Sequence, residues 1–217
     1  MRGELIFMGP PGSGKGTQAR LLADRYGWAQ LATGDLFRDH TRRGTELGRL
    51  ADRYMSKGAY VPDDLTVRMV RERLQEIPSD RRVLLDGFPR TVEQARALDG
   101  LLAEFDRSVG SVILIDVPQA ELVDRLAGRA TCASCQAVYS LVKRPPRVAG
   151  VCDRCGGPVA STARADDSPE VVARRFDVYE ELTRPVIEHY RERGLLRPID
   201  GTGEPDEITR RIVEAIA

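Results

Sequence analysis

The 217-residue sequence has no net charge, because 33 lysines and arginines balance 33 aspartates and glutamates. This balance gives no global reason to expect binding to nucleic acid or to a membrane surface, so any cationic site must be local. No apolar run approaches the roughly 18 residues that a membrane-spanning helix needs. The short apolar stretch near Met1 lacks the cleavage site of a signal peptide. We therefore expect a cytoplasmic protein with no membrane partner.

Cysteine is scarce, and its four copies form two Cys-x-x-Cys pairs, Cys132 with Cys135 and Cys152 with Cys155. In the cytoplasm such cysteines are more often metal ligands than disulfides. The spacing is typical of a four-thiolate zinc site, and four protein ligands leave no open position for catalysis. We therefore expect a structural Zn²⁺, with two disulfides or a redox pair as alternatives. The spacing does not distinguish zinc from iron or cobalt.

The segment around these cysteines carries basic residues that invite a second interpretation, since some zinc ribbons bind nucleic acid. Aromatic side chains, which usually accompany such binding, are represented there by Tyr139 alone. We therefore expect no nucleic-acid partner.

A glycine-rich segment, residues 9–17 (GPPGSGKGT), lies between an apolar run at 5–8 and an amphipathic run at 18–23. Strand, glycine-rich turn and helix are the context of a phosphate-binding loop, in which backbone N–H groups and a lysine surround phosphate oxygens. Lys15 supplies the point charge. The strict motif places Ser or Thr directly after the lysine, whereas Gly16 here precedes Thr17. The alternative is a glycine-rich turn without a ligand.

Strand and helix patterns alternate along the chain, which predicts a parallel sheet covered on both faces. Residues 130–163 differ, with all the cysteines and little helical periodicity, and we expect a small β-rich insertion there. The expected strands after the first cover 28–31, 82–86, 111–117 and 195–199. The expected helices after the first cover 36–43, 45–56, 61–76, 91–105, 118–128, 168–193 and 204–217. We expect Thr33 or Asp35 to cap the helix at 36–43, and Thr45 to cap the helix that follows it.

Charged residues at the ends of these elements are candidates for phosphate chemistry. Asp86 ends a buried strand, where ligand sites of α/β sheets are found, and its carboxylate could orient magnesium-bound water. A turn or helix cap is the alternative for Asp86. Arginine suits phosphate because its planar fork stays charged, although a surface salt bridge is the alternative for any single one. The candidate arginines are Arg38, Arg90, Arg125, Arg129, Arg164 and Arg175.

Four segments together resemble the adenylate kinase family, in its long form with a zinc-bearing lid. They are residues 9–17, Thr33-Gly-Asp35, Asp86-Gly-Phe-Pro-Arg90 with Gln94, and Arg164-Ala-Asp-Asp167. The segments occur in the family's order, and the resemblance covers essentially the whole chain. Gly16, which departs from the general phosphate-loop motif, is the residue that this family has at that position. The resemblance implies an α/β fold of the P-loop NTPase type. It divides the chain into a core (1–31, 62–127 and 166–217), a helical AMP-binding segment (32–61) and a zinc-binding lid (128–165).

The resemblance also implies a reaction, reversible phosphoryl transfer from Mg·ATP to AMP giving two ADP, in adenine nucleotide homeostasis. Lys15, Asp86, Arg90, Arg129, Arg164 and Arg175 would be catalytic. The ATP-binding residues would be Gly12, Ser13, Gly14, Lys15, Gly16, Thr17, Arg125, Arg129, Val138, Tyr139 and Gly203. The AMP-binding residues would be Thr33, Arg38, Ala59, Tyr60, Val61, Gly87, Phe88, Pro89, Arg90, Gln94, Arg164 and Arg175. Asp166 and Asp167 would position the lid, and Cys132, Cys135, Cys152 and Cys155 would hold zinc. The family suggests a monomer.

Three alternatives stay open at this stage. A UMP or CMP kinase is disfavoured by the long lid and by Thr91, where pyrimidine kinases usually have asparagine. A GTP-using relative is harder to exclude, since donor-base contacts are largely made by backbone. The third is a binding or scaffold protein with an inactive nucleotide fold, against which Lys15, Asp86 and Arg90 argue. One departure from the family is Ala130, where a second arginine often follows Arg129.

Overall fold

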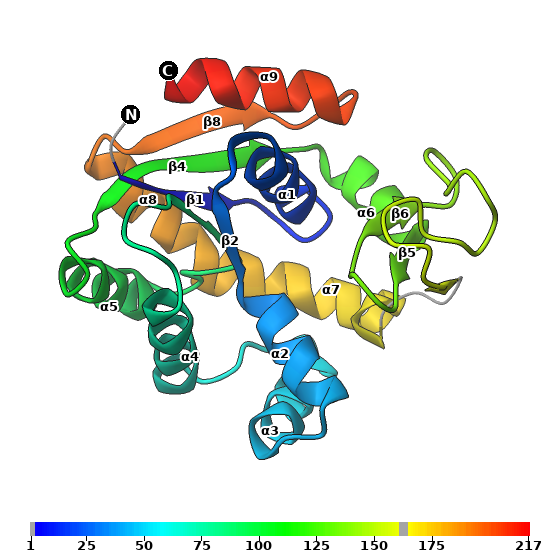
Figure 1. Cartoon of the computed structure of the whole chain (residues 1–217), viewed down its shortest axis with the longest axis horizontal. Coiled ribbons are helices and arrows are strands. Elements are labelled where there is room, and N and C mark those ends of the chain that lie inside the picture. The colour runs from blue at the N-terminus through cyan, green and yellow to red at the C-terminus, as the bar shows by residue number, and fades with distance from the viewer. Residues whose placement is uncertain (1–2, 161–164) are drawn as a thin grey trace.

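The computed structural model describes residues 3–160 and 165–217 and has a parallel five-stranded sheet at its centre (Figure 1). The strand order is β2-β3-β1-β4-β8, and all neighbours run parallel. These strands are β1 (Glu4–Met8), β2 (Ala29–Ala32), β3 (Val83–Asp86), β4 (Val109–Asp116) and β8 (Leu196–Asp200). The predicted α/β class is confirmed. The carboxyl ends of β1 and β3, which are neighbours, lead into the glycine-rich segment and into Gly87.

Helices cover both faces of this sheet, as continuous apolar strands require. On one face α4 (Asp63–Gln75), α5 (Val92–Ala103) and α8 (Arg184–Glu192) pack against the strands. The other face carries α1 (Lys15–Tyr26), α6 (Gln119–Ala127) and α9 (Pro205–Ile216). The helices α2 (Thr33–Arg42) and α3 (Glu46–Met55) form a separate pair beside the sheet (Figure 1). No helix among the described residues combines the length and apolarity needed to cross a membrane.

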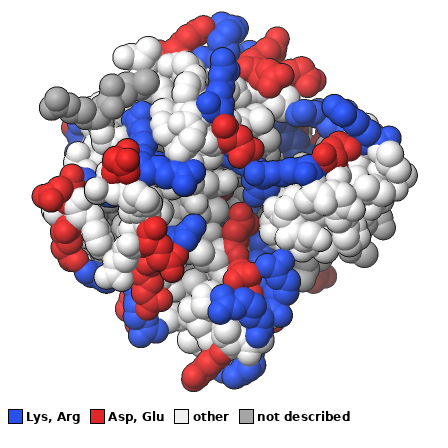
Figure 2. Space-filling model, in the orientation of Figure 1, with Lys and Arg blue, Asp and Glu red and all other residues white. Residues whose placement is uncertain are grey.

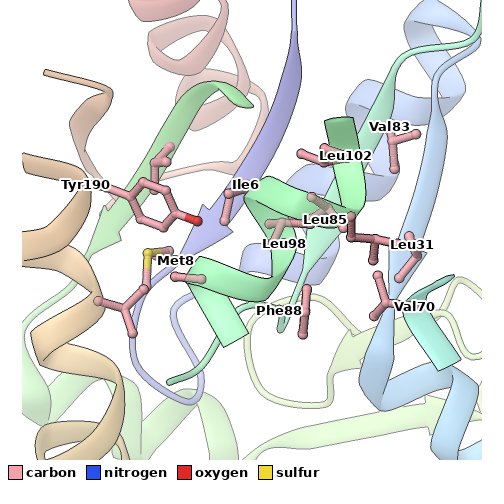
Figure 3. Close-up of a cluster of buried hydrophobic side chains, with 14 of the residues drawn as sticks. Ile6, Met8, Leu31, Val70, Val83, Leu85, Phe88, Leu98, Leu102 and Tyr190 are labelled. Atoms are coloured by element: carbon pink, nitrogen blue, oxygen red, sulfur yellow. The ribbon is translucent and has the colours of Figure 1, made fainter. Parts of the chain in front are cut away.

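Side chains along β1 point alternately into two hydrophobic cores, one on each face of the sheet. Ile6 and Met8 face the cluster with α4, α5 and α8, in which Tyr190 is the largest fully buried side chain (Figure 3). Leu5 and Phe7 face the cluster on the other side. Because β1 is buried on both faces, its end holds the glycine-rich segment on a rigid support.

The predicted β-rich insertion is a three-stranded antiparallel sheet of order β6-β5-β7. Its strands are β5 (Arg129–Cys132), β6 (Val138–Ser140) and β7 (Val159–Ala160). Its small core contains Ala130, Cys132 and Cys152. Ala130, which stands where a second arginine often follows Arg129, is fully buried in this core.

Two helix predictions were wrong in detail. The helix expected to begin at Leu36 begins at Thr33 instead, and Thr33 does not cap it, because its hydroxyl donates to Gly87 O (2.8 Å). The helix expected over 168–193 consists of α7 (Pro169–Val178), a π-helical turn (Tyr179–Thr183) and α8. Pro185 has no N–H to donate to the fourth preceding carbonyl, and the Arg184 N–H donates to Tyr179 O, five residues back.

Candidate active site

A cavity of about 770 Å³ lies between the sheet's carboxyl edge, the α2–α3 pair and the β-rich insertion. Figure 2 shows Lys and Arg side chains on both sides of the hollow that separates the insertion from the rest of this face. Its lining includes most of the residues predicted to bind nucleotide. They are Gly12, Ser13, Gly14, Lys15, Gly16, Thr17, Arg38, Ala59, Tyr60, Asp86, Gly87, Pro89, Arg90, Arg125, Arg129, Val138, Tyr139, Arg175 and Gly203.

The glycine-rich segment forms a loop around Lys15. Gly9, Gly12 and Gly14 all have positive φ angles (144°, 85° and 95°), which side-chain-bearing residues rarely adopt. Lys15 Nζ donates to Gly9 O (2.7 Å) and Pro10 O (2.9 Å), so the ammonium group lies inside the loop. Burial lowers the pKa of Lys15 to about 7, an effect opposed by Asp86 and reinforced by Arg90, Arg175 and Arg129. Such a desolvated cation is suited to an anionic ligand.

Asp86 explains why glycine follows the lysine. A Cβ at Gly16 would lie 3.0 Å from Asp86 Oδ2. A serine or threonine at that position would therefore press on the carboxylate. Burial raises the pKa of Asp86, while the charge of Lys15 acts in the opposite direction. The loop and the end of β3 thus form one unit with both charges facing the cavity.

Residues after β3 form the opposite end of the cavity. Arg90 Nε donates to Gly87 O (2.7 Å), and its backbone N–H donates to Gln94 Oε1 (2.8 Å). The Phe88–Pro89 peptide bond is cis. These bonds leave both terminal nitrogens of the Arg90 guanidinium without a hydrogen-bond partner among the described residues. Arg38 shares this end and pairs with Asp35.

Some predicted AMP-binding residues do not line the cavity. The side chain of Phe88 is buried in the core with α4, α5 and α8, and that of Val61 is buried in a smaller cluster formed with α2, α3 and α4. Thr33 and Gln94 are also buried, and the Gln94 amide donates to Asp63 Oδ1 (2.7 Å). Any contact of these four with a nucleotide stays a prediction.

Asp63 was missed by the sequence reasoning. Its carboxylate accepts from the hydroxyl of Thr91 (2.6 Å) and from Gln94, which ties the start of α4 to the start of α5. Two adjacent acidic residues after Pro62 gave only a helix-start signal.

Arg125 lies at the loop end of the cavity. Its guanidinium donates to Ser13 O (3.3 Å) and Gly201 O (2.8 Å) and pairs with Glu121. It thereby fixes the loop before Gly203 against the glycine-rich loop.

A buried carboxylate joins two arginines at the base of the insertion. Asp167, whose side chain is fully buried, accepts from Arg129 Nε (2.8 Å) and from Arg175 Nη1 (3.1 Å). Asp166 pairs with Arg175 at 3.1 Å. Both arginines line the cavity, so these aspartates hold them in place. Arg164 lies outside the described residues.

The four cysteines come together as predicted. Their sulfur atoms all lie within 4.8 Å of one another, and the Cys132–Cys155 and Cys135–Cys152 sulfur pairs are each 3.6 Å apart. Tetrahedral zinc with sulfur ligands at about 2.3 Å separates the sulfurs by about 3.8 Å. The donor set and its geometry therefore fit this metal.

Each Cys-x-x-Cys pair also contacts another part of the molecule. Arg42 of α2 donates to Ala133 O (3.2 Å), and Arg154 pairs with Asp24 of α1 (3.2 Å). The insertion therefore lies over the cavity and touches both sides of it. The sequence named Arg154 only as one of the basic residues near the cysteines and did not single out Arg42, since the two contacts join residues 91 and 130 positions apart.

Comparison with known proteins identifies the family. A family model described as "Adenylate kinase" matches residues 7–195. The chain belongs to the adenylate kinase family. It is 50% identical over 212 residues to an adenylate kinase of Symbiobacterium thermophilum, covering 98% of this chain and 97% of that protein. It is 45% identical to one from Archaeoglobus fulgidus (98% and 96% covered) and 43% to one from Staphylococcus aureus (98% of each).

The predicted family, fold and activity are thereby confirmed. The chain is an enzyme that converts ATP and AMP into two ADP. The four clustered cysteines agree with the form of the family that carries zinc in its lid. The assignment of individual residues to the two nucleotides is a separate question.

Proposed function

We propose that the cavity binds Mg·ATP at the glycine-rich loop and AMP at the end formed by Arg38 and Arg90. The carrying observation is the convergence of Lys15, Arg90, Arg129 and Arg175 on one cavity, close enough for the three arginines to lower the pKa of Lys15. Asp86, Asp166 and Asp167 offset part of this charge, but the four cations still lie together at one cavity, as the binding of a polyanion requires. Asp86 is the acidic residue facing Lys15.

We propose the following roles along the transfer path. Lys15 and the N–H groups of the loop hold the outer phosphates of ATP at the N-terminus of α1. Arg90 orients the AMP phosphate, whose anionic oxygen is already a nucleophile, so no general base is required. Arg129 and Arg175, fixed by Asp167, offset the charge that spreads over the transferring group. Magnesium supplies further positive charge on the ATP phosphates, and Asp86 would orient its bound water.

Water competes with AMP as acceptor, so the insertion has to cover the cavity during transfer. Its contacts with α2 through Arg42 and with α1 through Arg154 support this role. Accordingly we assign residues 32–61 to AMP binding, 128–165 to the lid, and 1–31, 62–127 and 166–217 to the core. A cytoplasmic monomer is part of the same proposal.

The experiment that tests the nucleotide assignment offers Mg·ATP with AMP, UMP, CMP or GMP in turn and measures diphosphate formation. Selective turnover of AMP supports the acceptor pocket described above. Preference for UMP or CMP would overturn it while leaving the phosphate chemistry in place. Replacing ATP by GTP then tests the donor base.

Nucleotide binding is expected to take up a proton above neutral pH. The pKa of Lys15 is about 7 in the free protein, and contact with phosphate oxygens raises it. Lys15 is therefore largely neutral at pH 8 before binding and charged afterwards, so binding takes up almost one proton. Calorimetry of ATP binding in buffers of different ionisation enthalpy measures this number. Lys15→Arg, which stays charged, should abolish the uptake, and equal uptake in that variant would assign the proton to another group.

We further propose that the four cysteines hold a structural Zn²⁺. The lid has a small core, so metal ligation supplies folding energy that its apolar side chains cannot. Removing the metal with a chelator is expected to lower Tm, by roughly 2–4 °C per kcal/mol for a chain of this size. The preference for AMP should stay unchanged in the remaining active enzyme. Altered acceptor preference would contradict a purely structural metal, and metal analysis of the purified protein distinguishes zinc from iron or cobalt.

A further inference from the structure

Three contacts form a ring that begins and ends at Arg90. The ring includes Thr183, which was not predicted to belong to the site. The guanidinium carbon of Arg90 lies 4.9 Å from the centroid of the Tyr60 ring. The Tyr60 hydroxyl lies 2.9 Å from the hydroxyl of Thr183. Thr183 Oγ1 in turn donates to Arg90 O at 2.9 Å. Tyr60 thus contacts the side chain of Arg90, and Thr183, which is hydrogen-bonded to Tyr60, contacts the Arg90 backbone.

The direction of these hydrogen bonds follows from the number of protons. Thr183 has one hydroxyl proton, and the Arg90 carbonyl can only accept. Thr183 therefore donates to Arg90, and the Tyr60 hydroxyl must donate to Thr183. The Thr183 hydroxyl thus both donates and accepts, the Tyr60 hydroxyl donates, and the Tyr60 ring is held beside the guanidinium.

Thr183 occupies an unusual place in the backbone. It is the last residue of the π-helical turn between α7 and α8, and only 5% of its surface is exposed. Such turns are rare within helices and occur frequently at functional sites. Thr183 also lines the cavity, together with Tyr60 and Arg90.

We propose that Thr183 is a positioning residue for Arg90, acting through the Arg90 carbonyl and through the ring of Tyr60. This inference rests on the role proposed above for Arg90 as a contact of the AMP phosphate. Two bonds already hold Arg90 at Gly87 and Gln94. Thr183 and Tyr60 add a constraint from the opposite element, so that the terminal nitrogens point to one place in the cavity. A guanidinium that is misplaced by a fraction of an ångström loses bidentate contact with phosphate.

The test compares Thr183→Val with Thr183→Ser and Tyr60→Phe. Thr183→Val removes both hydrogen bonds and keeps the shape, and we expect kcat/KM for AMP to fall about tenfold, the loss typical of one or two such bonds. The KM for ATP should change less than about twofold, since Arg90 does not hold the donor. Thr183→Ser should restore activity, and Tyr60→Phe should show part of the loss. Thr209→Val is the matched control, being equally buried with a hydroxyl that bonds to Gln18 and Pro205.

The decisive arm places Thr183→Val in an Arg90→Ala background. A residue that acts through Arg90 has nothing further to lose there, so kcat/KM for AMP should not fall again. A lowered Tm with unchanged kcat/KM for AMP in Thr183→Val, or an additive loss in the double variant, would overturn the proposal. If Thr183→Val fails to fold, Tyr60→Phe in the two backgrounds gives the same comparison. Near-normal AMP kinetics in Arg90→Ala alone would instead overturn the role of Arg90.

Discussion

Lys15→Ala is expected to lower kcat at least about 100-fold, the loss typical when a preorganised charge is removed from a transition state. Lys15 Nζ is held by Gly9 O and Pro10 O at 2.7 and 2.9 Å, so its position is fixed before nucleotide arrives. Phosphoryl transfer depends on alignment and charge more than on covalent help from the protein. Among the described residues, Lys143 also lines the cavity, but it pairs with Glu121 (3.6 Å) and not with the glycine-rich loop. Initial rates of ADP formation at saturating nucleotide measure the effect.

The stability of Lys15→Ala shows whether its activity is lost through catalysis or through misfolding. Because burial lowers the pKa of Lys15 to about 7, the free protein bears a cost for keeping that ammonium group charged. Lys15→Ala should therefore keep or raise the Tm of the nucleotide-free protein. Arg210→Ala, at an exposed cation of α9 that pairs with Glu214, is the control with unchanged activity. Turnover of Lys15→Ala within a few-fold of the unaltered enzyme would remove Lys15 from its catalytic role.

Sequence reasoning predicted the site correctly where the functional residues lie in one contiguous segment. The loop at 9–17, the buried strand ending at Asp86 and the two cysteine pairs each combine residue type with fixed spacing, and the structure brings them to the predicted places. The cap at Thr45, which accepts from Gly48 N (3.0 Å), was also readable, since capping is decided within one turn.

The sequence failed where a tertiary contact decided the outcome. Thr33 looked like a cap, yet its hydroxyl bonds to Gly87, 54 positions along the chain. Thr183 lay inside an apparently continuous helix, and nothing local indicates that its hydroxyl meets Arg90. Asp63 carried only a helix-start signal. Polar side chains that serve a distant partner leave no periodic pattern.

A buried ion pair was also missed because its two residues are far apart in the sequence. Breaking this pair is expected to have the largest effect on stability. Glu4 and Arg107, whose side chains are 6% and 5% exposed, pair at 2.7 Å between β1 and the segment before β4. Arg107 also donates to Pro78 O (2.7 Å) and Arg81 O (2.9 Å). It thereby ties together the start of β1 and the loop before β3. Charge at these positions looks like ordinary surface charge in the sequence.

Arg107→Met is therefore expected to cost up to about 3–5 kcal/mol of unfolding free energy, because it removes the cation that hydrogen-bonds the buried Glu4 carboxylate and leaves only the charge of Arg82 acting on it. The matched control is Arg71→Met, which breaks the pair with Glu104, where the side chains are 41% and 48% exposed. That change should cost at most about 1 kcal/mol. Urea titrations of both variants give the comparison. Adding Glu4→Gln to Arg107→Met removes the carboxylate charge while keeping an acceptor for the Val83 N–H, which Glu4 holds. The double variant should therefore be more stable than Arg107→Met alone, and a double variant of equal or lower stability would show that the lost bonds to the carbonyls, not the carboxylate charge, set the cost.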